Sequence, residues 1–155
     1  MIVTISRCNC HLLVLAGILV LVVLGGCRRN NWPGPDVVDA DAATEFTLSE
    51  SGLRYKILRR GRGPHPISKS LVRVHYRGTL DDGKVFDETY TMGMSSFFIL
   101  ENVIPGWTEG LQYIGTGGMI DLEIPPELAY GERGSGTRIP PNATIHFRIE
   151  LIHIE

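Results

Sequence analysis

The segment VIPGWTEGL at residues 103–111 places a large aromatic side chain in a helix that has little stability of its own. Pro105 suits the first turn of a helix, where its missing N–H needs no partner. Gly106 and Gly110 each cost about 1 kcal/mol relative to Ala inside a helix. Trp107 lies between these two glycines, and two interpretations are open: a core side chain, or part of a binding site that justifies so weak a helix.

The other residues that could do chemistry exclude several classes of site. The chain has five histidines, which are scattered at positions 11, 65, 75, 146 and 153 and show no pair at metal-ligand spacing. The sequence GTGG at 115–118 follows the expected helix and precedes an expected strand, the reverse of a phosphate-binding loop. We therefore predict no metal site and no cofactor.

The N-terminal region has the pattern of an export signal. Residues 12–26, LLVLAGILVLVVLGG, are wholly apolar and follow Arg7. A bilayer-spanning helix needs ~20 apolar residues, so this run is short for a permanent helix and typical of the core of a secretory signal. The sequence LGGC at 24–27 resembles the lipobox of bacterial lipoproteins, which implies cleavage before Cys27 and a lipid thioether on it. The alternative is an uncleaved transmembrane anchor with an incidental cysteine.

This pattern predicts three parts of the chain: a lipoprotein signal peptide over 1–26, a lipid-anchored flexible tether over 27–45, and a folded domain over 46–155. The expected location is the bacterial cell envelope, anchored to a membrane and facing the periplasm. Arg28 after the cysteine favours the outer membrane over the inner one.

Charge and cysteine content limit what the mature protein can do. Cys8 and Cys10 lie in the predicted signal, so the mature domain has neither a disulfide nor a reactive thiolate. Loss of Arg7 with the signal takes the formal net charge from −2 to −3. No basic field for nucleic acid is left.

From Phe46 onward, apolar and polar residues alternate with a period of two, which predicts half-buried strands. The sequence DDGK at 81–84 favours a tight hairpin turn. A sheet with one apolar face needs a cover, and the helix from Pro105 to about Tyr113 is the candidate. The two glycines would let this helix approach the sheet closely. The alternating apolar residues are Leu53, Tyr55, Ile57, Val72, Val74, Tyr76, Ile120, Leu122, Ile124, Ile145, Phe147, Ile149 and Leu151.

Four stretches of the domain carry a family resemblance: VHYRGTLDDGKVFDETY (74–90), VIPGWTEGLQYI (103–114), IPPELAYGERG (124–134) and IPPNATIHFRIELI (139–152). They resemble, in order and spacing, the FKBP-type peptidyl-prolyl cis-trans isomerases. The resemblance implies an α+β fold in which a five- to six-stranded antiparallel sheet wraps around one short helix. It also implies rotation of X–Pro bonds in unfolded or partly folded extracytoplasmic polypeptides, binding of macrolide immunosuppressant-type ligands, and a monomer.

Carried over by position, the resemblance assigns the site residues. Trp107 would be the floor of a prolyl pocket, and the backbone N–H of Ile104 and the hydroxyl of Tyr130 would hold substrate carbonyl groups. The expected catalytic residues are Asp87, Tyr130, Phe86 and Trp107, and the expected substrate-binding residues are Tyr76, Val103, Ile104 and Phe147.

Two positions depart from the family pattern. Ser96 stands where the family usually has an aromatic residue at the pocket edge, and Phe97 is the expected substitute. Ser135 and Arg138 stand where the family often has a histidine and an aliphatic residue. These departures bear on substrate preference more than on activity.

Each assignment has an alternative that the sequence leaves open. Phe147 and Val103 could be core residues, and Asp87 could be a surface residue after a turn. The whole domain could also be a non-catalytic chaperone or binding module of the same fold.

Overall fold

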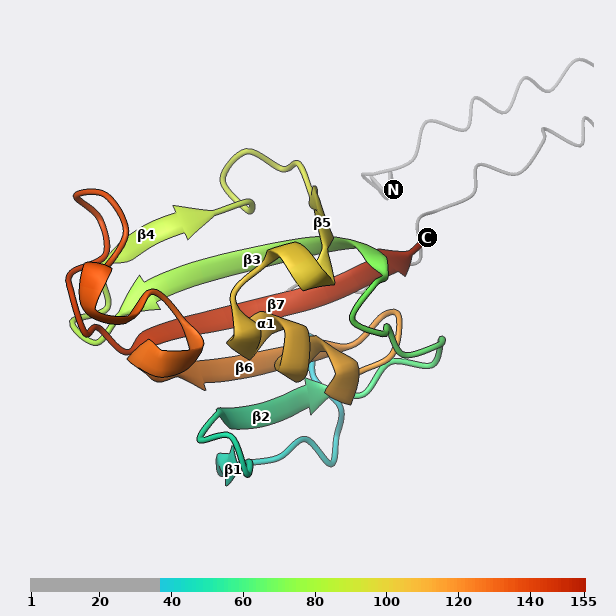
Figure 1. Cartoon of the computed structure of the whole chain (residues 1–155). Helices are drawn as coiled ribbons and strands as arrows, with labels where there is room; N and C mark the ends of the chain where they lie inside the picture. Colours follow the sequence, from blue (N-terminus) through green and yellow to red (C-terminus); the bar gives the residue numbers. More distant parts are fainter. Residues whose placement is uncertain (1–36) are drawn as a thin grey trace, which may run out of the picture. The chain divides into compact units, whose positions relative to one another are not determined.

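The computed structural model describes residues 37–155, in which an antiparallel sheet carries a short helix on one face (Figure 1). The strand order is β1-β2-β6-β7-β3-β4, and β5 pairs with the first half of β3 while β4 pairs with its second half. The strands are β1 (Thr47–Leu48), β2 (Arg54–Arg59), β3 (Leu71–Leu80), β4 (Val85–Glu88), β5 (Ser96–Ile99), β6 (Met119–Ile124) and β7 (Ile145–Ile154).

The predicted fold class is confirmed, with a sheet of seven strands. The two strands that the alternation does not indicate are β1 and β5, which have two and four residues and are too short to show a period. Gly83 at the predicted 81–84 turn has φ +80°, as a tight hairpin requires. Within residues 37–155, no helix is both long and apolar enough to cross a membrane.

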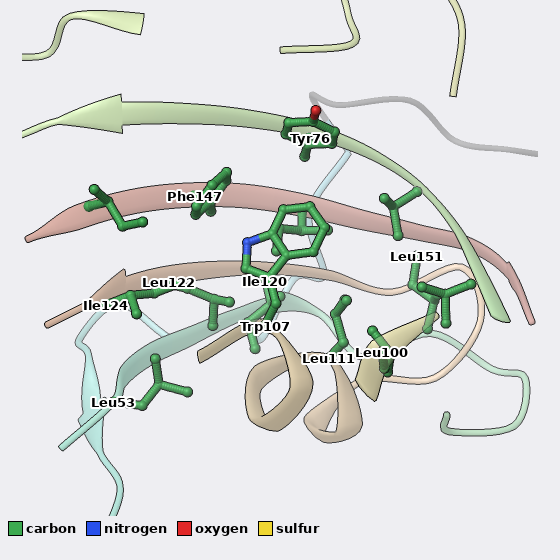
Figure 2. Close-up of a cluster of buried hydrophobic side chains, with 14 of the residues drawn as sticks. Leu53, Tyr76, Leu100, Trp107, Leu111, Ile120, Leu122, Ile124, Phe147 and Leu151 are labelled. Carbon is green, nitrogen blue, oxygen red and sulfur yellow. The ribbon is translucent and has the colours of Figure 1, made fainter. Parts of the chain in front are cut away.

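Helix α1 (Pro105–Gly110) lies against the sheet and continues as the short 3₁₀ helix η2 (Leu111–Tyr113). A Cβ on Gly106 would lie 2.5 Å from the Ile124 side chain, and one on Gly110 would lie 2.6 Å from Leu122. The glycines therefore allow the close approach that we expected, and burial offsets the poor helix propensity. Figure 2 shows Trp107 and Leu111 pointing from the helix into the core beside these β6 side chains.

We call the face of the sheet that α1 covers the helix face, and the opposite one the outer face. On β7 the alternation predicted from the sequence holds, because Phe147, Ile149 and Leu151 all belong to the core cluster under the helix. The core also contains Leu53 and Leu100, which are fully buried.

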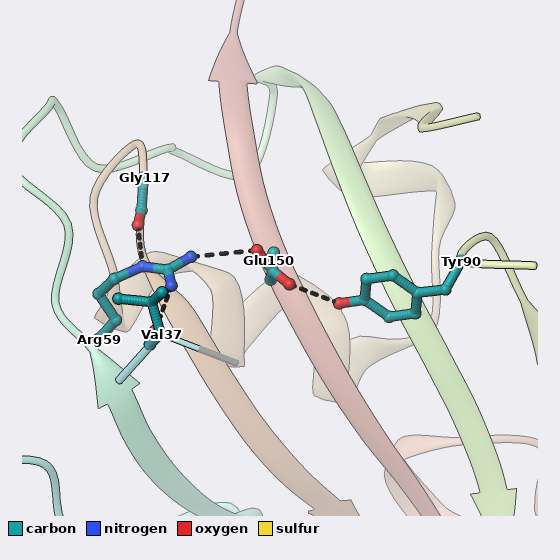
Figure 3. Close-up of polar contacts among 5 residues, drawn as sticks. All are labelled: Val37, Arg59, Tyr90, Gly117 and Glu150. Atoms are coloured by element: carbon teal, nitrogen blue, oxygen red, sulfur yellow. Dashed lines mark hydrogen bonds and ion pairs between the residues drawn. The ribbon is translucent and has the colours of Figure 1, made fainter. Parts of the chain in front are cut away.

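The outer face holds a buried ion pair that the strand pattern does not predict (Figure 3). By strict alternation Arg59 would lie on the apolar face with Tyr55 and Ile57, but β2 has a register shift between Ile57 and Arg59, which turns Arg59 to the outer face. The Arg59 side chain is buried, and its Nη2 lies 3.1 Å from Oε2 of Glu150, which is 0% exposed. Tyr90 donates its hydroxyl to the other oxygen of Glu150 at 2.8 Å.

Part of the segment expected to be a flexible tether is paired with β2. The Asp39 N–H donates to the Leu58 carbonyl at 2.8 Å, and the Ala43 N–H donates to the Ile57 carbonyl at 3.2 Å. Arg59 Nη1 donates to the carbonyl of Val37. Residues 37–43 therefore belong to the folded domain. The predicted signal peptide and Cys27 lie outside the described residues.

Candidate active site

A pocket of about 480 Å³ opens on the helix face, and its lining contains all eight residues that the sequence assigns to the site. The sheet supplies Tyr76 from β3, Phe86 and Asp87 from β4, and Phe147 from β7, whereas Trp107 comes from α1. Val103, Ile104 and Tyr130 come from the segments that flank the helical turns. These residues are far apart in sequence, and the antiparallel register brings them together.

Trp107 lies at the centre of an aromatic cluster (Figure 2). Its ring centroid lies 5.2 Å from that of Tyr76 and 5.0 Å from that of Phe147, with interplanar angles of 76° and 84°. These edge-to-face contacts hold the indole more firmly than packing area alone would. Because Trp107 is in the core cluster and also lines the pocket, its two proposed roles are compatible.

Gly78 on β3 makes room for this cluster, a role that the sequence does not reveal. A Cβ at Gly78 would lie 2.6 Å from Cζ of Phe86 and 2.7 Å from Cε1 of Phe147. The centroids of those two rings lie 5.4 Å apart in an edge-to-face contact. Without a glycine at position 78, the rings could not pack over β3 in this way.

This chain has Ser96 where the family has an aromatic residue at the pocket edge. The prediction that Phe97 takes over that role is wrong. In β5, Phe98 pairs with Val72 and lines the pocket, and its centroid lies 5.4 Å from that of Trp107. Phe97 points to the other face and is 52% exposed. Neighbouring residues of a strand point to opposite faces, whereas residues two apart point to the same face. Phe98 is therefore on the same face of β5 as Ser96, and Phe97 is on the other. Asn102 also lines the pocket and was not predicted.

Asp87 lies in β4 opposite Gly78, not in the turn. Its Oδ2 accepts a hydrogen bond of 2.7 Å from the Tyr76 hydroxyl. Burial, together with this carboxylate, raises the pKa of Tyr76, which therefore stays protonated and keeps donating. The bond fixes the carboxylate at the edge of the aromatic pocket.

Two hydrogen-bond donors of the pocket have no acceptor within residues 37–155. The Tyr130 hydroxyl lines the pocket, is partly exposed, and makes no hydrogen bond there. Burial and the nearby Asp87 charge raise the pKa of Tyr130, so this hydroxyl keeps its proton. The N–H of Ile104, the residue that caps α1, makes no bond either, although its carbonyl accepts from Trp107 and Thr108.

The indole Nε1 of Trp107 is a third donor without a partner in this part of the chain, and it is buried. Unpaired buried donors are rare in folded proteins and are costly in an apolar site. The pocket thus combines apolar walls with donors that have no partner among residues 37–155. Such a site can bind an apolar group that carries carbonyl oxygens.

Comparisons with known proteins agree with this geometry. Residues 63–152 match the family described as FKBP-type peptidyl-prolyl cis-trans isomerase. The chain is 50% identical over 107 residues to the Escherichia coli FKBP-type peptidyl-prolyl cis-trans isomerase FkpA, covering 69% of this chain and 39% of that protein. It is 47% identical over 128 residues to a probable FkpA of Neisseria meningitidis, covering 82% of this chain and 47% of the relative.

Two solved structures share the fold. The crystal structure of E. coli FkpA matches with a TM-score of 0.70 and 48% identity, covering 73% of this chain and 53% of that one. A peptidyl-prolyl cis-trans isomerase from Pseudomonas syringae matches with a TM-score of 0.67 and 37% identity, covering 73% of this chain and 83% of that one. The chain thus spans less than half the length of the two curated relatives described above. The family match, these identities and the shared fold together place this chain in the family of FKBP-type peptidyl-prolyl cis-trans isomerases.

Proposed function

We propose that this protein accelerates cis-trans rotation of X–Pro bonds in proline-containing polypeptides. The observation that carries the proposal is the pocket around Trp107, where apolar aromatic walls meet two unpaired donors, the Ile104 N–H and the Tyr130 hydroxyl. A proline ring is the apolar group of the right kind, and the peptide carbonyls on either side of it are the acceptors that such donors need.

The physical basis is the loss of amide resonance during rotation. The barrier is roughly 18–20 kcal/mol, and the twisted amide is less dipolar than the planar one. Water stabilises the planar ground state more, so a pocket that excludes water favours the twisted state. Phe86, Trp107, Tyr76 and Phe147 supply the apolar walls, and Val103 adds to the rim.

The donors hold the substrate while the bond rotates. In this scheme the Ile104 N–H binds a carbonyl on one side of the bond, and the Tyr130 hydroxyl binds one on the other. Asp87, fixed by Tyr76, orients the wall and faces the carbonyl carbon of the rotating amide. No bond is made or broken, so the scheme needs no nucleophile.

The alternative is a non-catalytic chaperone or binding module of the same fold. The experiment that separates the two is turnover of a short X–Pro peptide by the full chain. Accelerated isomerisation that a macrolide immunosuppressant-type ligand inhibits supports the enzyme, whereas binding of the peptide without acceleration supports the binding module.

We also propose that the protein is lipid-anchored in the bacterial envelope and faces the periplasm. Of the two membranes, the outer one is the proposed anchor site. The proposal rests on the apolar run 12–26, on LGGC at 24–27, and on Arg28. In this proposal, 1–26 is removed and the chain that follows Cys27 tethers an isomerase domain that includes residues 37–43.

The test is Cys27→Ser, with Cys10→Ser as the matched control, because Cys10 lies in the predicted signal. We expect Cys27→Ser to stay unprocessed or to become soluble, and Cys10→Ser to be processed and lipidated, as measured by mass spectrometry of the N-terminus. A Cys27→Ser protein of mature size in the membrane fraction would contradict the lipid anchor.

A further inference from the structure

Arg138 lies at the rim of the prolyl pocket although it is not part of the lining. It belongs to the loop between η4 (Gly131–Arg133) and β7. Its Nη1 donates to the Phe86 carbonyl at 2.9 Å, across 52 residues of sequence. Phe86 and the next residue, Asp87, both line the pocket. The positive charge of Arg138 is also close enough to oppose the rise in the pKa of the Tyr76 hydroxyl.

The loop that carries Arg138 is held in place from both ends. The Ser135 N–H donates to the Ile139 carbonyl at 2.9 Å, and the Ile139 N–H returns a bond of 3.1 Å to the Ser135 carbonyl. Ile139 is buried in the core cluster. Gly134 has φ +61°, and a Cβ there would lie 2.3 Å from the Ile139 carbonyl oxygen. Arg138 therefore extends from an anchored backbone toward β4.

The charge of Arg138 is not neutralised within residues 37–155. Other arginines, such as Arg54 and Arg148, pair there with carboxylates at 2.5 and 2.8 Å, but Arg138 has no such ion pair. The nearest acidic residue of the pocket, Asp87, receives its hydrogen bond from Tyr76 instead.

The bond to Phe86 does not need a charge. A guanidinium carries five N–H donors, and the carbonyl uses one of them. A neutral N–H group at the place of this Nη1 could make the same contact. The remaining donors and the full positive charge are thus directed to the exposed rim beside the proline site, where a carboxylate could accept two parallel bonds.

We propose that Arg138 is a specificity-determining residue that selects substrates with Asp or Glu beside the proline over those with Lys or Arg. The inference rests on the proposed isomerase activity and adds a substrate class to it. A partly exposed guanidinium and carboxylate attract each other weakly, so we expect a preference of about 3- to 5-fold in kcat/KM at low salt.

The experiment compares matched peptides that differ only in Glu, Gln or Lys next to the proline, with one series before the proline and one after it. The wild-type chain should turn over the Glu peptide faster than the Lys peptide in at least one series. The ratio should fall toward one in 0.5 M salt, because exposed charges are screened.

Four variants test whether Arg138 is the cause. Arg138→Gln removes the charge but keeps a polar side chain with N–H donors, and it should equalise the Glu and Lys peptides, whereas Arg138→Glu should reverse their order. Arg138→Lys retains the charge and should retain the preference. Arg133→Gln is the matched control, since Arg133 is an exposed arginine at the end of η4, just before this loop, with no hydrogen bond or ion pair in residues 37–155, and it should keep the wild-type ratio.

The ratio of two peptides on one protein sample does not depend on the fraction folded. Equal turnover of the Glu and Lys peptides by the wild type, or an unchanged ratio in Arg138→Gln, would overturn the proposal while leaving the isomerase intact. Failure of the wild type on the Gln peptide as well would overturn the isomerase function and this proposal together.

Discussion

The Glu150 cluster on the outer face and the pocket on the helix face treat polar groups in opposite ways. On the outer face, the buried Glu150 carboxylate accepts from Arg59 on one oxygen and from Tyr90 on the other. On the helix face, the Tyr130 hydroxyl and the Trp107 indole N–H have no partner within residues 37–155. The Glu150 cluster satisfies its charges internally, whereas the pocket leaves these donors without a partner in residues 37–155 around an apolar hollow.

This difference distinguishes structural polar groups from functional ones. A buried charge that meets its partners can only be perturbed at a cost in folding, since removal of one partner leaves the other uncompensated. A donor kept unpaired at a pocket gains its partner only when a ligand arrives. We therefore expect changes on the outer face to act on stability, and changes at the pocket to act on turnover.

The largest expected effect on the outer face follows from Arg59→Met. This change leaves Glu150 buried without its ion-pair partner and should cost about 3–5 kcal/mol in the free energy of unfolding, as measured by urea denaturation. The double variant Arg59→Met/Glu150→Leu should recover most of that loss. Turnover per folded molecule should not change in either variant. A single variant that loses less than about 1 kcal/mol would refute the comparison.

Trp107→Ala is the one change expected to affect both properties, because Trp107 belongs to the core and to the pocket. Truncation of a buried aromatic side chain costs ~3–5 kcal/mol, and the loss of the platform should abolish prolyl turnover. Thermal melts and a prolyl-peptide assay would measure the two effects. Full activity in this variant would end the assignment of Trp107 as the floor of the site.

Asp87→Leu should separate turnover from stability. Asp87 is exposed and its hydrogen bond to Tyr76 contributes about 1 kcal/mol, so the melt should shift little. Turnover should fall roughly tenfold or more, which corresponds to about 1.4 kcal/mol in the barrier. Asp82→Leu, in the 81–84 turn away from the pocket, is the control and should retain activity. Unchanged turnover in Asp87→Leu would make Asp87 a surface residue only.

The smallest expected effect is a pH dependence that belongs to the outer face alone. Burial lowers the pKa of His75 below its ordinary value of 6.5, with Glu150 opposing this and Arg73 reinforcing it. As the pH falls, His75 is therefore protonated in the unfolded chain before it is protonated in the folded one. The stability that His75 contributes is therefore fully present above pH 6.5 and is lost as the pH falls below it.

Urea denaturation at about pH 7.5 and 5.5 would measure this loss of stability. The loss should be smaller in His75→Gln and unchanged in His153→Gln, the control at an exposed histidine. Turnover by the folded protein should stay nearly flat from about pH 5.5 to 8, because carboxyl and phenol groups have reference pKa values outside that window. A bell-shaped profile near neutrality would implicate a histidine in the reaction.

The sequence by itself determined which strand faces are apolar, and its resemblance to the FKBP-type isomerases supplied the fold class and the eight pocket residues. The period-two alternation marks which face of β3, β6 and β7 is apolar, because side-chain direction in a strand is set by local geometry. The motif around Trp107 could be interpreted for the same reason: Pro105 and the two glycines act within a few residues of one another. Signals of this kind are complete within a short window.

The tertiary structure alone decided four other features: which aromatic of β5 enters the pocket, why Gly78 must lack a side chain, where residues 37–43 lie, and that Arg59 is buried. Each depends on a partner that is remote in sequence or on strand register. Glu150, for example, is 91 residues from Arg59. An arginine is expected at the surface unless such a partner compensates its charge, and only the folded sheet brings that partner within reach.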